Sequence, residues 1–230
     1  NYINLKNVSF RYSNKTDYVL KNINLKVKNG SRVGIIGQTG CGKSTLLDIL
    51  AGLIKPTKGN LYIDNQPLNS KNVKYWYSRI SYVPQNIFLL DSSIKENIAL
   101  GVLKNNIDLK RVKLASKVAK LDNFIEKNND GYDQVVGEKG IKLSGGQRQR
   151  IGIARSIYKN SKVILFDEAT AALDNKTEKE VIESIKNISK DITVIMIAHR
   201  ISTLKYCDVI IRLKNGNIEG LYKYKDIKNS

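Results

Sequence analysis

The feature that most constrains the fold is a glycine-rich loop between an apolar strand and a helix. The strand covers residues 32–36, and the residues after it read Gly-x-x-x-x-Gly-Lys-Ser, the phosphate-binding pattern. Glycine permits positive φ and a close backbone approach, so successive N–H groups can surround an anion. The helix predicted from Ser44 to about Leu53 directs its positive dipole end to the same place. A glycine turn before a core helix is the plain alternative, and the strand, loop and helix together favour a phosphate site.

Each polar residue of this loop has an expected task. Lys43 supplies a positive charge for the β- and γ-phosphates, and the Ser44 hydroxyl can bind Mg²⁺. Cys41 is either a small filler, which we favour, or a reactive thiol that nucleotide would protect. The predicted nucleotide contacts here are Gly37, Gln38, Thr39, Gly40, Cys41, Gly42, Lys43, Ser44 and Thr45.

Strands and helices alternate along the rest of the chain, which predicts an α/β fold with a mostly parallel sheet and ligands at the carboxyl ends of its strands. A capping box of Ser93 and Glu96 begins one helix. Asp108 can cap a longer helix, and the pattern does not decide whether that helix extends to Phe124. The dipeptide Asn215-Gly216 predicts a hairpin. Strand patterns occupy residues 2–6, 8–10, 19–20, 23–27, 60–64, 79–83, 162–166, 193–198 and 208–213.

The composition limits the class of protein. A length of 230 residues suits one large domain. Two cysteines, Cys41 and Cys207, are too few for a disulfide framework and fit a reducing compartment. No apolar run reaches the ~18–20 residues of a membrane span. The sequence does not begin with methionine, so we expect a segment of a longer chain.

The charge is strongly positive, with 39 basic against 21 acidic residues and a net charge of +18. Such a balance suits nucleic acid or anionic lipid. However, most of these cations are lysines distributed along the chain, and no block of five basic residues with interleaved aromatics occurs. We therefore expect solvated surfaces and no specific nucleic-acid partner.

Two acidic residues follow the apolar run 163–166 and suit a metal site. Asp167 would hold Mg²⁺ directly or through water, and Glu168 could orient and deprotonate an attacking water. Alone, an Asp-Glu pair is usually surface charge, but its occurrence with the phosphate loop favours a catalytic role.

His199, the single histidine, follows another buried strand and is either structural or a donor to a γ-phosphate. Tyr12 either packs in the sheet or stacks on an adenine.

The segment Ser144-Gly145-Gly146-Gln147 also has two readings. Ser-x-x-Gln is itself a capping box that begins a helix. Two glycines in a first turn weaken a helix by about 1 kcal/mol each relative to alanine. They become useful where another backbone or a phosphate must come close, and a helix N-terminus is then a second anion site.

Together these motifs resemble the nucleotide-binding domain of an ATP-binding cassette (ABC) transporter over nearly the whole chain. Residues 37–44 resemble Walker A, residues 143–147 the signature motif and residues 163–167 Walker B. The resemblance places the remaining single residues: Tyr12 as the A-loop aromatic, Gln85 in the Q-loop, Glu168 as catalytic carboxylate, Asp174 in the D-loop (with Ala171 where serine is usual) and His199 as switch histidine.

The resemblance implies a P-loop NTPase with a RecA-like sheet, flanking helices, an N-terminal antiparallel β subdomain and a helical signature subdomain. Residues 1–84 and 158–230 would form the core and β subdomain, and residues 85–157 the helical subdomain. It also implies ATP and Mg²⁺ as cofactors. Catalysis would fall to Lys43, Glu168 and His199; Ser44, Gln85 and Asp167 would hold the metal; and Tyr12, Gln85, Ser144, Gly145, Gly146, Gln147 and Asp174 would contact nucleotide in addition to the loop.

Two partners follow from the resemblance. One is a transmembrane domain, expected on the same polypeptide, which places the chain at the cytoplasmic face of the cell (inner) membrane. The other is a second nucleotide-binding domain, paired head to tail so that each Walker A faces the partner's Ser144–Gln147. Residues 82–88 and 94–98 resemble exporters, and residues 150–155 and 197–200 resemble bacterial flippases of lipid-linked oligosaccharides.

The alternatives are an exporter of peptides, lipids or drugs, and a soluble ABC ATPase that acts on nucleic acid or ribosomes. Chromosome-maintenance relatives need a long coiled coil between the Walker motifs, and residues 86–143 carry no heptads. Translation relatives usually carry two cassettes, and one set of motifs is present here. A plain nucleotide kinase would not explain Ser144–Gln147.

Overall fold

The computed structural model describes residues 2–14, 16–170, 172–188, 191–198 and 200–228. By its internal contacts the chain forms two compact units. Unit 1 consists of Asn1–Tyr82, Lys162–Asp167 and Asp191–Ser230, and unit 2 consists of Val83–Ser161 and Glu168–Lys190. The predicted helical subdomain, 85–157, lies within unit 2, which also includes residues 168–190; the subdomain assignment itself stays a prediction.

The first sheet of unit 1 is antiparallel and has the strand order β2-β1-β4-β5. Along β2 the buried side chains alternate with exposed ones over most of the strand, as in a sheet with one face on the core. The predicted N-terminal antiparallel part is therefore present. Its strands are β1 (Tyr2–Phe10), β2 (Leu20–Lys28), β4 (Lys58–Ile63) and β5 (Gln66–Pro67).

The second sheet has the order β10-β9-β3-β8-β7-β6, and its strands β9, β3, β8 and β7 are parallel. Strand β10 closes a hairpin with β9 through Asn215 and Gly216, both at positive φ, which confirms the hairpin prediction. The first four residues of β7 are buried, as a central parallel strand requires. The strands are β3 (Arg32–Ile36), β6 (Ile80–Val83), β7 (Val163–Asp167), β8 (Thr193–Ile197), β9 (Val209–Lys214) and β10 (Asn217–Tyr222).

The register of this sheet positions the candidate site. Ile35 of β3 and Asp167 of β7 both pair with Ile197 of β8. The carboxyl end of β3, where the glycine-rich loop begins, therefore lies at the same sheet edge as Asp167. This is the edge at which parallel α/β sheets bind ligands.

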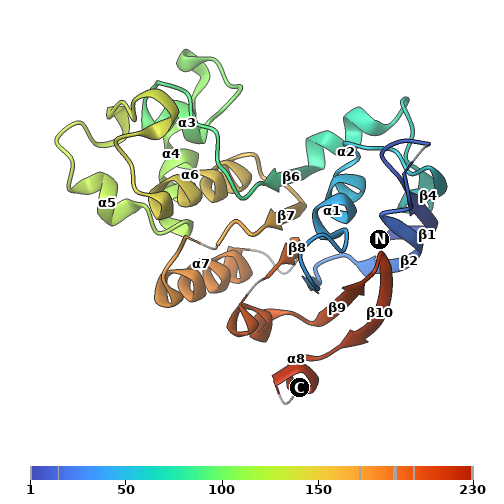
Figure 1. Ribbon diagram of the computed structural model, residues 1–230. Coiled ribbons are helices and arrows are strands. Elements are labelled where there is room, and N and C mark those ends of the chain that lie inside the picture. Colours follow the sequence, from blue (N-terminus) through green and yellow to red (C-terminus); the bar gives the residue numbers. More distant parts are fainter. Residues whose placement is uncertain (1, 15, 171, 189–190, 199, 229–230) are drawn as a thin grey trace. The chain divides into compact units, whose positions relative to one another are not determined.

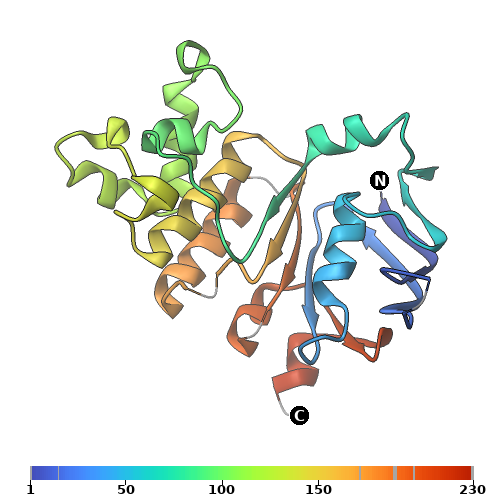
Figure 2. The same cartoon turned by 45° about the horizontal axis from the view of Figure 1, so that its top comes forward.

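Helix α1 (Lys43–Ala51) lies between the two sheets of unit 1 (Figures 1 and 2). Leu46, Leu47, Ile49 and Leu50 are all fully buried, so the helix is covered on most of its sides, as expected of a core helix. Its packing fixes the position of the loop that precedes it. Unit 1 also contains α2 (Val73–Arg79), α8 (Tyr224–Lys228) and a short 3-10 segment, Ile201–Tyr206.

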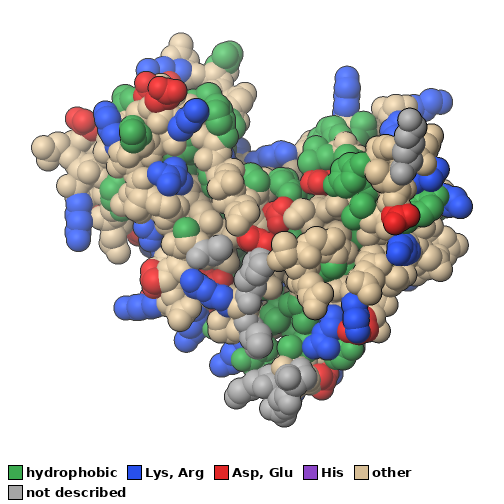
Figure 3. Space-filling model, viewed as in Figure 1, with side chains coloured by type: hydrophobic (Ala, Val, Ile, Leu, Met, Phe, Trp, Pro, Cys, Tyr) green, Lys and Arg blue, Asp and Glu red, His purple; other side chains and the backbone are tan. Residues whose placement is uncertain are grey.

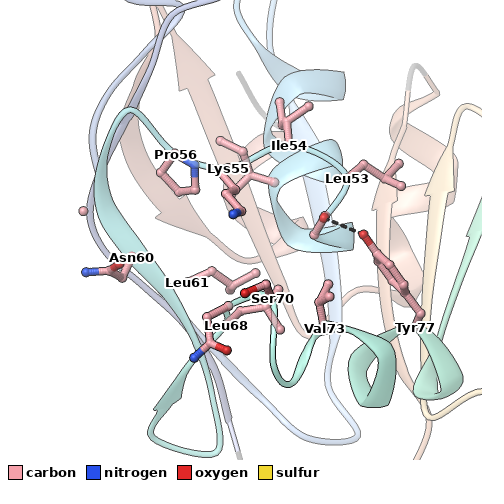
Figure 4. A pocket seen from close by; sticks show the side chains of 14 residues that line it. Leu53, Ile54, Lys55, Pro56, Asn60, Leu61, Leu68, Ser70, Val73 and Tyr77 are labelled. Atoms are coloured by element: carbon pink, nitrogen blue, oxygen red, sulfur yellow. Dashed lines mark hydrogen bonds between the residues drawn. The ribbon is translucent and has the colours of Figure 1, made fainter.

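A cavity of about 370 Å³ lies at the C-terminal end of α1, away from the glycine-rich loop (Figure 4). Leu53 to Pro56, strand β4 and α2 line it. The Tyr77 hydroxyl donates a 2.9 Å hydrogen bond to the Gly52 carbonyl there. This bond anchors α2 to the end of α1.

Unit 2 is a helical cluster in which α4 packs against α3, α5, α6 and α7. Arg155 of α6 connects two other segments of unit 2, because its guanidinium donates hydrogen bonds of 2.6 Å to the carbonyls of Asn97 and Phe88. Burial lowers the pKa of Arg155 to about 10. The helices are α3 (Ile94–Ile98), α4 (Leu109–Val118), α5 (Asp122–Glu126), α6 (Gly145–Tyr158) and α7 (Asn175–Ile188), with 3-10 segments at Lys104–Asn106, Gly131–Asp133 and Glu138–Gly140.

The surface is basic without one dominant cluster on the face drawn in Figure 3, where Lys and Arg side chains are spread over many elements. Among the described residues, no helix combines the length and the apolar character needed to cross a membrane.

Candidate nucleotide-binding site

The glycine-rich loop has the backbone conformation that its sequence predicts. Gly37, Gly40 and Gly42 have φ values of 154°, 80° and 102°. A Cβ at Gly37 would lie 2.3 Å from the Leu213 carbonyl oxygen and 2.7 Å from the Cys41 sulfur, so only glycine fits. Cys41 is buried and fills this space, which agrees with its reading as a filler.

The N-terminus of α1 is left without a cap by the described side chains. Its N-cap position is Gly42, which makes no side-chain hydrogen bond, and the first turn contains no acidic residue. The first N–H groups of a helix need a partner, and the helix dipole favours an anion there. The N-terminus of α1 is therefore suited to an anion such as a phosphate, and phosphate binding there stays a prediction.

Lys43 is held inside the loop, with only 7% of its surface exposed. Its ammonium group donates to the carbonyl oxygens of Gly37 and Gln38, each at 2.9 Å. An ammonium has three donors, and among the described residues two of them are used. The remaining donor and the positive charge lie where the loop would hold phosphate oxygens.

Ser44 and Asp167 come together as the sequence predicts. The Ser44 hydroxyl donates to Oδ1 of Asp167 over 3.3 Å, although 123 residues separate them. A hydroxyl and a carboxylate are oxygen ligands of the kind that Mg²⁺ prefers, and Mg²⁺ usually keeps several waters and adds substrate phosphates. These two residues therefore fit the predicted metal site.

Two further residues belong to this cluster and were not predicted. The Tyr82 hydroxyl, on β6, donates a 2.8 Å hydrogen bond to the other carboxylate oxygen of Asp167, Oδ2. Burial, and then this bond, raise the pKa of Tyr82, so the phenol remains a donor. Asp48 of α1 lies beside them, and burial followed by the charge of Asp167 raises its pKa. The spacing of Asp48 and Ser44, four residues apart on one helix, was the available signal.

Tyr12 follows the end of β1 and lies next to the start of α1. Its hydroxyl shares a 3.0 Å hydrogen bond with the Thr45 hydroxyl. Its ring meets Phe10 edge to face, with centroids 4.9 Å apart, and the residue is 65% exposed. An exposed ring fixed at the phosphate loop suits stacking on an adenine.

Gln85 and Glu168 belong to unit 2, and their part in the site stays a prediction. Gln85 is exposed and follows β6. Glu168 directly follows Asp167 and has a positive φ of 53°. A non-glycine residue in this conformation is uncommon, and such strain often occurs at functional positions. His199 and Ala171 lie outside the described residues, so the role of His199 also stays a prediction.

The segment Ser144–Gln147 forms the capping box at the start of α6. The Gln147 N–H donates to the Ser144 hydroxyl at 3.2 Å, and the Ser144 N–H donates to the Gln147 side chain at 2.8 Å. A Cβ at Gly146 would lie 3.2 Å from the Ala172 carbonyl oxygen. The glycine therefore does admit a neighbouring backbone, one of the two reasons considered from the sequence. Contact of this segment with nucleotide stays a prediction.

The backbone near Ala172 is held by α6 and by its own helix. The Ala172 N–H donates to the Gln149 side chain at 2.9 Å. Asp174 caps α7, because its carboxylate accepts from the N–H groups of Lys176 and Thr177. The Thr177 hydroxyl and N–H bonds lower the pKa of Asp174. Nucleotide contact by Asp174 remains a prediction.

Comparison with known proteins places this geometry in a family. The family model described as ABC transporter matches residues 20–171. The leukotoxin translocation ATP-binding protein LktB of Mannheimia haemolytica is 41% identical over 226 residues, which cover 98% of this chain and 32% of that protein. LktB of Mannheimia glucosida is 41% identical over 225 residues, with the same 98% and 32% coverage.

A solved structure agrees with these relatives. The structure of a bacterial Atm1-family ABC exporter with ATP bound matches with a TM-score of 0.92 and 36% identity, over 99% of this chain and 39% of that one. The chain spans about a third of the length of the curated relatives that it matches.

Proposed function

This chain belongs to the ABC transporter family, and from that premise we propose that it hydrolyses ATP with Mg²⁺ to drive export through a membrane-spanning domain. ATP binding and ATPase activity are general in this family. The observation that most supports the proposal is the arrangement of Lys43, Ser44 and Asp167 around an uncapped helix N-terminus. It offers a charge for phosphates and oxygen ligands for a cation within one unit.

The residues divide the proposed reaction between them. Lys43 and the loop amides would hold the β- and γ-phosphates, while Ser44, Asp167 and Gln85 would hold the metal. Magnesium, when bound, supplies positive charge to the phosphate oxygens. Glu168 orients a water molecule and accepts its proton, and His199 donates a hydrogen bond to the γ-phosphate.

The proposed site is completed by a second cassette. In the head-to-tail pair, Ser144, Gly145, Gly146 and Gln147 of one copy face the phosphate loop of the other. Ala172 and Leu173, which directly precede Asp174, lie beside that segment in unit 2, because both approach Gly146. Nucleotide and partner would then be recognised by one connected structure.

The proposed second partner is a transmembrane domain, on the same polypeptide, at the cytoplasmic face of the cell (inner) membrane. The relatives support this, because they are exporter proteins about three times as long as the matching segment. They also favour the exporter over a soluble ATPase that acts on nucleic acid or ribosomes.

Two substrates have support. Residues 150–155 and 197–200 resemble flippases, and on that basis we propose a lipid-linked oligosaccharide. The relatives named for leukotoxin translocation favour a second candidate, an exported polypeptide. Reconstitution of the full protein in vesicles separates the two: flipping of a labelled lipid-linked sugar supports the first, and movement of a polypeptide alone supports the second.

Replacing Glu168 with glutamine tests the proposed chemistry. Glutamine keeps the shape but cannot accept a proton, so hydrolysis should fall by ~10²–10⁴-fold while ATP affinity is kept. Phosphate release and binding of a fluorescent ATP analogue measure the two quantities. Normal hydrolysis in this variant would remove Glu168 as the base.

The dependence of the rate on protein concentration tests the composite site. If two copies form each site, the hydrolysis rate of the chain should rise more than linearly with its concentration. A strictly linear rate across the concentrations at which ATP is bound would show that one copy suffices.

A further inference from the structure

Each carboxylate oxygen of Asp167 accepts a hydrogen bond from a hydroxyl group, one from a serine and the other from a tyrosine. Oδ1 accepts from the Ser44 hydroxyl at 3.3 Å, and Oδ2 accepts from the Tyr82 hydroxyl at 2.8 Å. The Ser44 bond is longer than the usual range of about 2.5–3.0 Å for O–H···O hydrogen bonds, whereas the Tyr82 bond is close to the most common length. The tighter bond therefore lies on the oxygen that faces away from Ser44.

This difference matters when a cation binds. Ser44 and Oδ1 are the oxygens that fit Mg²⁺, so their mutual bond would give way if both bound the metal. The Tyr82 bond does not compete, because it uses the other oxygen. A hydrogen bond from a neutral hydroxyl to a carboxylate is short and about twice as strong as one between neutral groups. The Tyr82 bond is therefore suited to hold Asp167 in one orientation during ATP binding and hydrolysis.

Tyr82 itself is well placed to do so. It lies on β6, the neighbour of β7 in the sheet, and β7 ends at Asp167. The residue is half-buried. The phenol also interacts with Asp48, so a single rigid ring stands against two carboxylates of unit 1. Asp48 lies on α1, one turn beyond Ser44.

We propose that Tyr82 is a positioning residue of the metal site, whose hydroxyl fixes Asp167 so that Oδ1 faces Ser44 and the cation. This inference rests on the proposed Mg²⁺–ATP function. It assigns to Tyr82 no contact with nucleotide or metal. The hydroxyl acts only through the Asp167 carboxylate.

The test removes one oxygen atom. Tyr82→Phe keeps the ring and its packing but leaves Oδ2 without the phenol. With the full chain and a fluorescent ATP analogue, the Mg²⁺ concentration that half-saturates the metal-dependent part of binding should rise about tenfold, as for a lost hydrogen bond to a charged group. Binding in the presence of excess chelator, and the melting temperature by circular dichroism, should change little. Mn²⁺ titration followed by electron paramagnetic resonance gives the same comparison without hydrolysis.

A matched control is available in the same unit. Tyr77→Phe also removes a phenol hydrogen bond, the 2.9 Å bond to the Gly52 carbonyl at the far end of α1 (Figure 4). It should leave the Mg²⁺ and Mn²⁺ dependence unchanged. An equal shift in both variants would show a general loss of rigidity and would overturn the inference.

A double variant separates positioning from packing. With Asp167→Asn already in place, Tyr82→Phe should cause no additional loss of metal affinity, because the hydroxyl then has no carboxylate to position. An effect of the same size in both backgrounds would overturn the inference. So would an unchanged metal dependence in Tyr82→Phe, while wild-type chain with no metal-dependent ATP binding would instead overturn the proposed function.

Discussion

The helices α1 and α6 both have glycine at their start, but their first N–H groups are satisfied in different ways. Helix α1 begins after Gly42, with no capping side chain among the described residues and no acid in its first turn. Helix α6 begins after Ser144 with a complete capping box, in which Ser144 and Gln147 satisfy each other's N–H groups. Among the described residues, the start of α1 therefore has no side-chain cap, whereas the start of α6 is capped by its own side chains.

This difference separates two kinds of anion site. The open end of α1 costs stability without a ligand, because its first N–H groups lack side-chain partners. It also has a charge at hand, since Lys43 is buried in the same loop. The closed end of α6 is stable on its own, and a phosphate there would have to share or replace the cap. We therefore expect α1 to bind ATP alone and α6 to contribute when a second copy presents it.

The largest effect on ATP affinity should come from removing the positive charge at the start of α1. Lys43→Ala takes away the ammonium that lies against the Gly37 and Gln38 carbonyls, so ATP affinity should fall by ~100-fold, about 2–3 kcal/mol for a lost charged hydrogen bond. Fluorescent-analogue binding measures it. Lys26→Ala, an exposed lysine on β2, is the matched control and should bind normally. Equal affinity of Lys43→Ala and the wild type would contradict the open-end site.

A smaller loss of ATP affinity is expected when the aromatic residue next to the start of α1, Tyr12, is replaced. Tyr12→Ala removes an exposed ring that could stack on adenine, a contribution of ~1–3 kcal/mol per base, and ATP affinity should fall about tenfold. Tyr12→Phe keeps the ring and loses only the Thr45 bond, so it should retain most of the affinity. Competition with inorganic triphosphate, which has no base, should be the same in all three proteins. A loss of triphosphate binding in Tyr12→Ala would instead indicate damage to the loop.

Much of this architecture was readable from local signals. The α1 loop, the capping boxes at Ser93 and Ser144, and the Asn215-Gly216 turn each depend on residues a few positions apart, and each is present. The continuous apolar run of β7 likewise identified a central strand.

Elements without a local signal were missed. Helix α2 has no side-chain capping hydrogen bond at its N-cap, Asn72, and a single buried residue, Trp76, whose indole donates to the Leu50 carbonyl. Tertiary packing, which is not visible in a short window, holds it. The tail helix α8 was missed too, and the possible extension of α4 to Phe124 is wrong, because Lys120 turns the chain at a φ of 58°.

The same distinction between residues with and without a local signal applies to the candidate site. Ser44 and Asp167 were paired because both residues carry motif signals. Tyr82 was missed because a tyrosine in a strand is ordinarily a packing residue, and 85 positions separate it from Asp167. A hydrogen bond over such a sequence distance depends on the sheet order, which one sequence without relatives does not contain.

The smallest effect, a loss of stability, should come from removing the side-chain cap at the start of α6. Ser144→Ala removes the hydroxyl that accepts from the Gln147 N–H, and loss of an N-cap typically costs ~1 kcal/mol. Urea unfolding of the full chain should show a loss of that size. ATP affinity at low protein concentration should not change, because we expect α1 to bind the nucleotide without a second copy.

Ser93→Ala is the matched control, since Ser93 and Glu96 form the other capping box of unit 2. Both variants should lose similar stability, but only Ser144→Ala should also lower the hydrolysis rate at high protein concentration. An equal decrease in the two rates would mean that Ser144 acts through stability alone. A rate decrease confined to Ser144→Ala would mean that the hydroxyl caps α6 in the single chain and serves nucleotide in the pair, so that the closed helix end is also a site.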